Sequence, residues 1–268
     1  MRDTIKRTLP SPVVNALKTT LDYSKIAREW PSARLHPWRV ESIRKLEKLR
    51  DSHAGERCVI IGNGPSLKNT DLQKLRNVFT FGMNRFYMAF PDLGFTTSTL
   101  VTVNSLVIEQ CAADLRALPI PTFISWRGRK YIQPAPNLHY LYTSYILPGF
   151  NGNATGRLWE SSTVTFVAMQ LAYFMGFKQV ILIGVDHNFA TKGTANTTVV
   201  SNGDDPNHFH PGYFGKGFRW QLPDLETSEI GYAMAKEAFE KDGREILDAT
   251  VDGKLQIFPK VNFDSILS

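Results

Sequence analysis

The sequence predicts an α/β protein built on a single Rossmann-like, doubly wound and mainly parallel sheet. Short apolar stretches alternate with helical ones from residue 57 onward, which is typical of parallel α/β sheets. The first stretch, residues 58–61, is apolar throughout and ends at a glycine, as a central strand buried on both faces does. The 268 residues are 43% hydrophobic and 21% charged, which suits a globular domain and excludes collagen, coiled coil and wholesale disorder.

The other elements are expected in chain order. Further strands are expected at 78–83, 99–103, 122–125, 138–143, 179–183 and 245–247. Helices are expected at 71–75, 105–118, 162–175 and 225–241. Ser105 is the expected N-cap of the second helix, and Gly176 suits the position after the third. Residues 187–224 are polar and glycine-rich without a regular period, so we expect a functional or mobile lid there.

Residues 1–56 are expected to form a basic helical extension before the domain at 57–268. Apolar residues recur there at helical spacing among Lys and Arg. Residues 1–58 contain 13 of the 31 basic and 7 of the 25 acidic side chains, which accounts for the whole net charge of +6. The extension either packs on its own domain or on a partner subunit of a homo-oligomer, or it lies on an anionic membrane surface.

The remaining 210 residues contain 18 basic and 18 acidic side chains, so the body is neutral. We expect no nucleic-acid binding, because that depends on many phosphate contacts. The chain has no run of eighteen apolar residues, and its first residues lack the apolar core of a secretory signal. The two cysteines, Cys58 and Cys111, are too few for a disulfide framework, so we expect a cytoplasmic location, with peripheral contact at the membrane's inner face as the variant.

A glycine turn, GNGPSL at residues 62–67, follows the first strand. Gly62 and Gly64 allow a tight turn and the close approach of a ligand. Pro65 and Ser66 then begin a helix, whose free N–H groups favour a phosphate. The motif lacks the third glycine of the dinucleotide fingerprint and the Gly-Lys-Ser/Thr of a P-loop. Because such turns are frequent in any α/β fold, the motif alone is a weak signal.

Three asparagines, Asn63, Asn84 and Asn104, stand at the ends of three successive predicted strands. The carboxyl ends of parallel strands meet at one edge, so we expect these side chains at one crevice, where open α/β sheets bind ligands. A neutral amide suits a ribose hydroxyl, a pyrimidine edge or a phosphate oxygen. Asparagine is also a common turn residue, but three in register favour a polar site.

The long polar segment contains the candidate bases His208 and His210. Histidine can remove a proton from a hydroxyl near neutral pH. Asp186, after the strand at 179–183, is expected to orient a histidine or a substrate hydroxyl, or else to cap a turn. Asp186, Asp204 and Asp205 could instead ligate a divalent ion with the histidines. Their spacing matches no familiar metal motif, so we expect no metal.

Arg157, Ser162 and Thr163 stand before the long buried helix. Hydroxyls and N–H groups at a helix start suit a phosphate. The same residues also serve as ordinary caps, which is the simpler interpretation for each taken alone.

The glycine turn, Asn84, Asn104 and residues 162–186 together resemble bacterial sialyltransferases of the Campylobacter lipooligosaccharide type. Over residues 57–265 the chain also resembles the wider family that shares this domain with flagellin-modifying nonulosonate transferases and 6-hydroxymethylpterin diphosphokinases. The resemblance implies one Rossmann-like domain with a lid, a CMP-activated sugar across the strand ends, no metal or other cofactor, and a lid histidine as base.

Matched by motif, the resemblance makes His208 the base, with His210 as a close rival, and assigns Asn63, Asn84 and Asn104 to the nucleotide and sugar. Asp186 matches the family's Asp after its last strong strand. The phosphate-holding tyrosines that follow this Asp in the family are replaced by HNF at 187–189. Tyr213 is the expected substitute, and Arg157 is offset from the family's arginine.

The leading hypothesis is an inverting, metal-independent glycosyltransferase. It moves a sialic-acid-like (nonulosonic) sugar from a CMP donor to a hydroxyl of a surface-polysaccharide precursor. One alternative is a diphosphokinase that uses ATP and magnesium, which needs clustered acids. The other is a protein that binds a nucleotide or sugar without catalysis.

Overall fold

The computed structural model describes residues 11–266, and an eight-stranded sheet forms its centre. The strand order is β10-β7-β1-β2-β3-β4-β5-β6, and every neighbouring pair is parallel. The strands are β1 (Arg57–Ile61), β2 (Phe79–Met83), β3 (Thr99–Thr102), β4 (Thr122–Ser125), β5 (Leu138–Ser144), β6 (Arg157–Trp159), β7 (Gln179–Ile183) and β10 (Glu245–Asp248). The expected parallel α/β sheet is therefore confirmed.

The direction of the chain across the sheet reverses between β1 and β7. The chain places β1 to β6 side by side in one direction and then returns to add β7 on the other side of β1. A crevice opens at such a switch point because the connections on its two sides leave in opposite directions. The topology thus predicts a ligand site beyond the carboxyl ends of β1 and β7.

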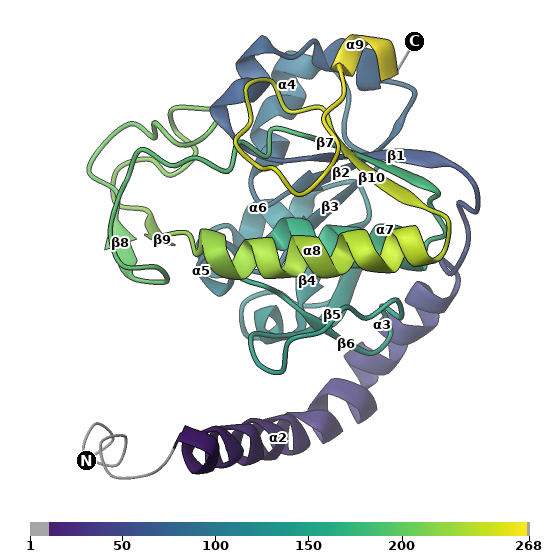
Figure 1. Ribbon diagram of the computed structural model, residues 1–268, viewed down its shortest axis with the longest axis vertical. Helices are drawn as coiled ribbons and strands as arrows, with labels where there is room; N and C mark the ends of the chain where they lie inside the picture. Colours follow the sequence, from purple (N-terminus) through teal and green to yellow (C-terminus); the bar gives the residue numbers. More distant parts are fainter. Residues whose placement is uncertain (1–10, 267–268) are drawn as a thin grey trace.

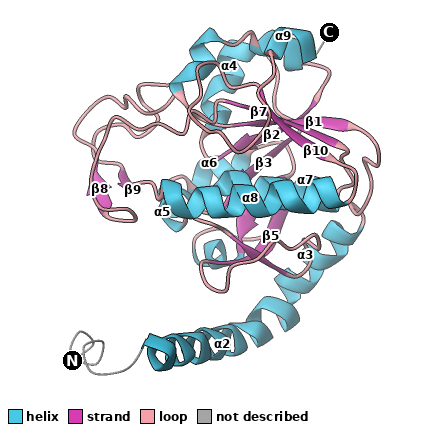
Figure 2. Cartoon of the chain, viewed as in Figure 1, coloured by secondary structure: helices cyan, strands magenta, loops and turns pink. Residues whose placement is uncertain are grey.

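Helices cover both faces of the sheet (Figure 1; Figure 2). The α-helices are α2 (Ser11–Leu35), α3 (Pro37–Glu47), α4 (Phe90–Leu93), α5 (Ser105–Gln110), α6 (Ala112–Ala117), α7 (Val164–Phe174), α8 (Leu225–Lys241) and α9 (Phe263–Ile266). Four 3₁₀ turns join them: η1 (Pro65–Asn69), η2 (Leu72–Leu75), η3 (Phe86–Ala89) and η4 (Trp126–Lys130). A separate antiparallel hairpin, β8 (Thr198–Val200) and β9 (Arg219–Gln221), lies beyond the sheet in the segment expected to be a lid.

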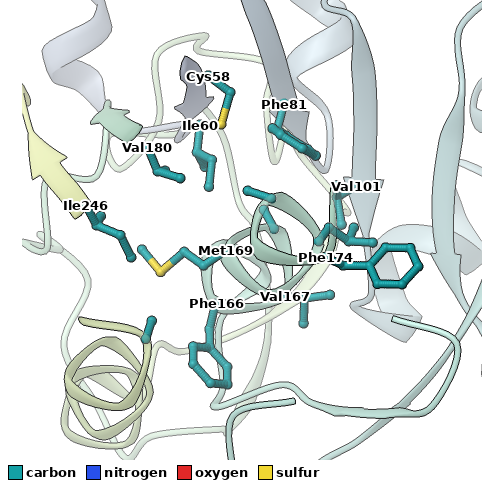
Figure 3. Packing of buried hydrophobic residues seen from close by; sticks show 14 of the residues in the cluster. Cys58, Ile60, Phe81, Val101, Phe166, Val167, Met169, Phe174, Val180 and Ile246 are labelled. Carbon is teal, nitrogen blue, oxygen red and sulfur yellow. The ribbon is translucent and has the colours of Figure 1, made fainter. Parts of the chain in front are cut away.

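Alternate residues of β1 supply two different cores, because successive strand side chains point to opposite faces. Cys58 and Ile60 belong to the core beneath α7, and Val59 and Ile61 belong to the core on the other face. Figure 3 shows α7 lying across the first face, with its apolar side chains among those of the strands. This burial explains why residues 164–174 are apolar on almost every side.

The expected helix at 105–118 is divided into α5 and α6 at Cys111, whose φ of −115° and ψ of 21° leave the helical region. The N-cap is Asn104 rather than Ser105, since the Asn104 side chain accepts from the amides of Leu106 and Val107. The helix begins at Ser105 as expected, but the expectations that it runs unbroken to residue 118 and that Ser105 is its N-cap were wrong. The strands β6, β8 and β9 are three residues long and were too short to be recognised by periodicity.

The N-terminal segment is helical in its described part, and residues 1–10 of the expected extension lie outside that part. α3 packs on β5: the Ser42 hydroxyl accepts from the Tyr140 amide at 3.0 Å, and Leu46 is fully buried. Among residues 11–266, no helix is both long and apolar enough to cross a membrane.

Candidate active site

Two adjoining cavities lie at the carboxyl ends of the strands. The β1 compartment, of about 160 Å³, lies beyond β1, β2 and β7, and the β3 compartment, of about 170 Å³, lies beyond β2 and β3. Both are lined by Asn84, by Ser162 and Thr163 at the start of α7, and by His208 of the lid. They therefore form one crevice with these residues at its centre.

The glycine turn brings β1 and β7 into contact at the floor of this crevice. A Cβ on Gly62 would lie 2.1 Å from the Gly184 carbonyl oxygen, and one on Gly64 would lie 1.8 Å from Oδ2 of Asp186. Only glycine fits at either position, because real Cβ contacts do not occur at such distances.

The N–H groups of Gly64 and Ser66 in this turn already have partners within the protein. The Ser66 amide donates to Oδ1 of Asp186 at 3.0 Å, and the Ser66 hydroxyl donates to Oδ2 at 2.7 Å. The Gly64 amide donates to the carbonyl of Gly184. A carboxylate of the same chain thus takes the place at which a phosphate was expected, and Pro65 and Ser66 are not among the residues that line either compartment.

Asp186 is at the edge of the β1 compartment with its charge only partly solvated. Burial raises the pKa of this carboxyl above its ordinary value, and the two hydrogen bonds from Ser66 act in the opposite direction. Asp186 thus caps the first turn of η1, and its carboxylate accepts from Ser66 rather than from a histidine.

The three strand-end asparagines all line the crevice. Asn63 is at the β1 compartment, Asn104 is at the β3 compartment, and Asn84 borders both. The Oδ1 atom of Asn63 is buried and has no hydrogen-bond partner, whereas Asn84 accepts from the Thr102 hydroxyl at 3.0 Å and Asn104 caps α5. Asn63 therefore has an amide oxygen still able to accept from a ligand.

The start of α7 is one strained part of the crevice, and Asn84 and His187 of its lining also have positive φ, of 52° and 53°. Ser161 and Ser162 have φ of 45° and 57°, in the left-handed region where residues other than glycine are uncommon. Such strain, of the order of 1–3 kcal/mol per residue, clusters at functional sites. Thr163 is the N-cap and accepts from the Thr165 amide at 3.2 Å. Ser162 and Thr163 therefore present hydroxyls at the positive end of an eleven-residue helix.

His208 enters the crevice from the lid with its orientation fixed by Asp205. Its Nδ1 atom lies 2.7 Å from Oδ2 of Asp205, and its ring stacks on Tyr213 with centroids 4.0 Å apart. Because an ionised carboxylate can only accept, Nδ1 carries the hydrogen, and Nε2 is left with its lone pair for a ligand. Both side chains are largely buried, with exposures of 12% and 3%.

The same carboxylate also accepts from the amides of Asn207 at 2.8 Å and Phe214 at 3.1 Å. These bonds keep Asp205 in place beside Nδ1 of His208. From the sequence, Asp204 and Asp205 were considered as possible ligands of a divalent ion, and of this pair only Asp204 is exposed. The spacing of three residues between Asp205 and His208, within a turn, is the signal that could have identified the pair.

Three other expected site residues lie away from the crevice lining. The Nδ1 atom of His210 accepts from the Gly212 amide at 3.0 Å. Tyr213 is buried behind His208, and its hydroxyl accepts from the Arg85 amide. The guanidinium of Arg157 donates to the Ser144 hydroxyl and to the carbonyls of Ile146 and Leu147. It therefore supports the connection that follows β5.

The crevice has few charges. Within the described part of the chain, no Lys or Arg lines either compartment. The β3 compartment contains Glu160, whose side chain is only 2% exposed and pairs with Arg127. Arg127 also donates to the Thr143 carbonyl and lies over the ring of Tyr145 at 4.5 Å, so its guanidinium is committed to the protein.

The acids considered for a metal are separated by their partners. Asp186 is bonded to Ser66 and Asp205 to His208, while Asp204 is exposed. In residues 11–266 no group of three or more His, Cys, Asp or Glu side chains is arranged to hold a metal ion. The donors present therefore do not form a magnesium site of clustered carboxylates.

A family model described as 6-hydroxymethylpterin diphosphokinase MptE-like matches residues 37–192. The chain belongs to this MptE-like family. The match includes β1 to β7, the glycine turn, the three asparagines and the start of α7, and it ends before Asp205 and His208. In this MptE-like chain, both His208 and the Asp205 carboxylate that orients it thus lie in a segment that the family model does not include. No curated protein sequence matches the chain.

Among solved structures, the MptE-like chain is similar to the MAf glycosyltransferase from Magnetospirillum magneticum AMB-1. The TM-score is 0.50 at 14% sequence identity, over 96% of this chain and 43% of the other. The chain therefore spans less than half the length of that protein, and at this identity the likeness concerns the fold.

Proposed function

We propose that this protein is an inverting glycosyltransferase that requires no metal. It transfers a sugar of the nonulosonic (sialic-acid-like) type from a CMP donor to a hydroxyl of a surface-polysaccharide precursor. The observation that carries the proposal is the position of His208, oriented by Asp205, between the two compartments. A base between two adjoining spaces is the arrangement that a transfer between two substrates needs.

In the proposed reaction, Nε2 of His208 removes the proton of the acceptor hydroxyl. The acceptor oxygen forms a bond to the anomeric carbon while the bond from that carbon to the phosphate oxygen breaks, and CMP leaves with the electron pair. Attack opposite the leaving group inverts the anomeric carbon. The imidazolium that forms is stabilised by Asp205.

The departing phosphate is assigned to the start of α7. Ser162, Thr163 and Val164 line both compartments at the positive end of this helix. Donors aimed at the oxygen on which charge develops stabilise the transition state. The glycine turn is the less suitable place, because Asp186 already accepts from it.

The low charge of the crevice favours a donor with one phosphate. A single phosphodiester needs few cationic partners, whereas a triphosphate would meet no Lys or Arg on the described lining. The amide oxygen of Asn63 and the amides of Asn84 and Asn104 suit the hydroxyls and base edge of a nucleotide sugar.

The description of the family favours one second candidate, an ATP-dependent diphosphokinase. The residues present do not fit the magnesium ion that this chemistry uses, because Asp186, Asp204 and Asp205 are not gathered. We therefore assign no step through a metal.

The test is a transfer and hydrolysis assay with CMP-N-acetylneuraminate on His208→Ala and His210→Ala. We expect His208→Ala to lose about 10²- to 10⁴-fold in kcat, the usual contribution of a general base. His210→Ala is the matched control and should stay within a few-fold of the parent. Unchanged turnover in His208→Ala would remove this residue as the base.

A ligand screen by thermal shift tests the donor separately. CMP should raise the melting temperature with or without magnesium, because a ligand that binds only the folded state stabilises it. If only ATP with magnesium raises it, the diphosphokinase replaces the glycosyltransferase as the better proposal.

A further inference from the structure

The two compartments of the crevice differ in the part of the chain that lines each one alone. Only the β1 compartment is lined by the glycine turn and by residues 184–188, which lie within the region that the family model matches. Only the β3 compartment is lined by Asn196, Phe214 and residues 220–222, which lie outside it. We call these five residues the lid wall. Loops on a common scaffold set specificity, so the lid wall is expected to select a substrate.

Trp220 is the largest side chain of the lid wall. In β9 it is buried between two exposed neighbours, so its side chain lies on the opposite face of the strand from theirs. The indole stacks on Phe214 with centroids 5.5 Å apart, and Phe214 stacks on Phe218 at 4.8 Å. Two further rings thus fix the plane of the indole, which keeps 8% of its surface exposed.

Helix α5 holds the hairpin that carries Trp220 (Figure 1). The side-chain amide of Gln110 pairs with the backbone of Arg219 as a neighbouring strand would. Its nitrogen donates to the Arg219 carbonyl at 2.8 Å, and its oxygen accepts from the Arg219 amide at 2.9 Å. The Arg219 guanidinium also pairs with Glu109 at 3.1 Å. These bonds position the residue next to Trp220, although neither Gln110 nor Arg219 lines the compartment.

The polar groups of the β3 compartment suit an uncharged, hydroxyl-rich ligand. Among the described residues its lining contains no Lys or Arg, and Glu160 is its one carboxylate. An ionised carboxylate accepts from hydroxyls and repels an anion. The Oδ1 atom of Asn196 is a further acceptor, because the bond of this side chain to Asp224 uses Nδ2. A pyranose ring matches both features, since its C–H face packs on an aromatic ring while its hydroxyls donate.

We propose that the β3 compartment is the acceptor subsite and that it holds an uncharged pyranose sugar against the indole of Trp220. The assignment rests on the proposed function, in which the acceptor hydroxyl must reach His208, a residue of this lining. The nucleotide of the donor then occupies the β1 compartment, and the start of α7 lines both. Trp220 is a specificity-determining residue, and Gln110 is a positioning residue that acts through it.

The first experiment is ¹⁹F NMR of the full chain with 5-fluorotryptophan at its five tryptophans. The probes are methyl β-galactoside and methyl N-acetyl-β-glucosaminide, which are neutral, and methyl β-glucuronide, which is anionic. At least one neutral glycoside should shift the Trp220 resonance saturably and leave those of Trp30 and Trp126 unchanged. Trp220→Phe identifies the resonance by its loss. The glucuronide should bind about tenfold more weakly, since like charges at a binding site oppose each other.

The second experiment measures the half-saturating glycoside concentration of variants by saturation-transfer NMR. Trp220→Leu should raise it about tenfold or more, as truncation of a central aromatic contact does. Gln110→Ala should raise it about threefold or more and should move the Trp220 resonance before any glycoside is added. Because Gln110 lies outside the compartment, this variant tests the same wall if Trp220→Leu does not fold, which circular dichroism shows.

Matched controls carry the same changes elsewhere. Trp30→Leu alters an exposed tryptophan of α2, and Gln73→Ala removes a side chain that donates to the Leu93 carbonyl. Both should bind the glycosides as the parent does.

The inference is overturned if no glycoside shifts the Trp220 resonance, if the glucuronide binds as well as the neutral glycosides, or if the controls lose as much affinity as the lid-wall variants. It is also overturned if CMP shifts this resonance and the glycosides do not, which would assign the donor nucleotide to the β3 compartment. None of these measurements uses turnover. A failure of the proposed function, seen as no turnover of the CMP donor, is therefore distinguishable from a failure of this inference.

Discussion

Nδ1 of His208 and Oδ2 of Asp205 are 2.7 Å apart and largely shielded from water. This contact fixes which ring nitrogen carries the hydrogen, so it decides whether Nε2 can accept a proton.

Replacing Asp205 by Asn should therefore impair catalysis more than binding. The amide can hold the ring in the other tautomer, which places a hydrogen on Nε2, and we expect kcat to fall about 10²-fold or more. The dissociation constant for CMP should change little. Asp204→Asn is the matched control because Asp204 is the exposed neighbour. Equal kcat values for the two variants would contradict this role.

Replacing Gly62 by Ala should destabilise the protein, because the added Cβ would lie 2.1 Å from the backbone oxygen of Gly184. Neither strand can move without disturbing the sheet, so we expect a loss of about 3 kcal/mol in the free energy of unfolding. Gly149→Ala is the control, since an added Cβ meets nothing within 4 Å there. Urea unfolding measures both. A stability of Gly62→Ala equal to that of the control would refute the close contact of β1 and β7.

Replacing Glu160 by Gln removes the charge that compensates Arg127. The Glu160 side chain is 2% exposed and that of Arg127 is 28% exposed. Breaking such a pair leaves an uncompensated charge, so we expect a loss of about 2 kcal/mol, reduced from the fully buried case by the solvent that reaches Arg127. The double variant Glu160→Leu with Arg127→Met should be more stable than Glu160→Gln. The same or lower stability in the double variant would show that the pair is not the cause.

The stability of the protein should fall in mild acid because of His139. Its ring is buried against Phe123 with centroids 4.8 Å apart, and burial lowers its pKa to about 4, with Lys45 acting in the same direction. The unfolded state takes up the proton at about pH 6.5. The stability that the folded state gains from a neutral His139 is therefore fully present above pH 6.5 and is lost as the pH falls toward 4.

Urea unfolding at pH 7.5 and pH 5 measures this effect. The parent should lose about 2 kcal/mol over that range through this residue alone, from 1.36 kcal/mol for each pH unit below 6.5. His139→Gln should lack this part of the pH dependence, although it is less stable at pH 7.5. If His139→Gln loses as much stability between pH 7.5 and pH 5 as the parent does, the loss is due to groups other than His139.

Much of the fold could be predicted because burial controls the sequence of its central strands. β1 and β7 are apolar over nearly their whole length, since they are covered on both faces, and the limits of β7 were predicted to the residue. The lid could not be predicted in the same way. Its contacts, such as Phe209 to Asn63 and Arg85 to Gly212, join segments distant in the sequence without any period.

The site residues that stand at the ends of strands could be predicted from the sequence. The hydrogen-bond partners of the site's side chains could not. Asn63, Asn84 and Asn104 reach one crevice because parallel strands end at one edge. The partner of Asp186 is Ser66 and the partner of His208 is Asp205, and neither choice is evident from residue type. Arg157 was expected at the ligand because it precedes α7, but its guanidinium faces the connection after β5.

The bond between Ser66 and Asp186 spans 120 positions of the chain. The floor of the crevice therefore cannot exist in a nascent chain until β7 and the residues after it have left the ribosome and added to β1. Strands β1 to β6 can associate in order as they are synthesised, because each is adjacent to its predecessor. Ligand binding would thus report a late long-range step of folding, and a fragment that stops before residue 179 would contain six of the eight strands of the sheet but lack the site.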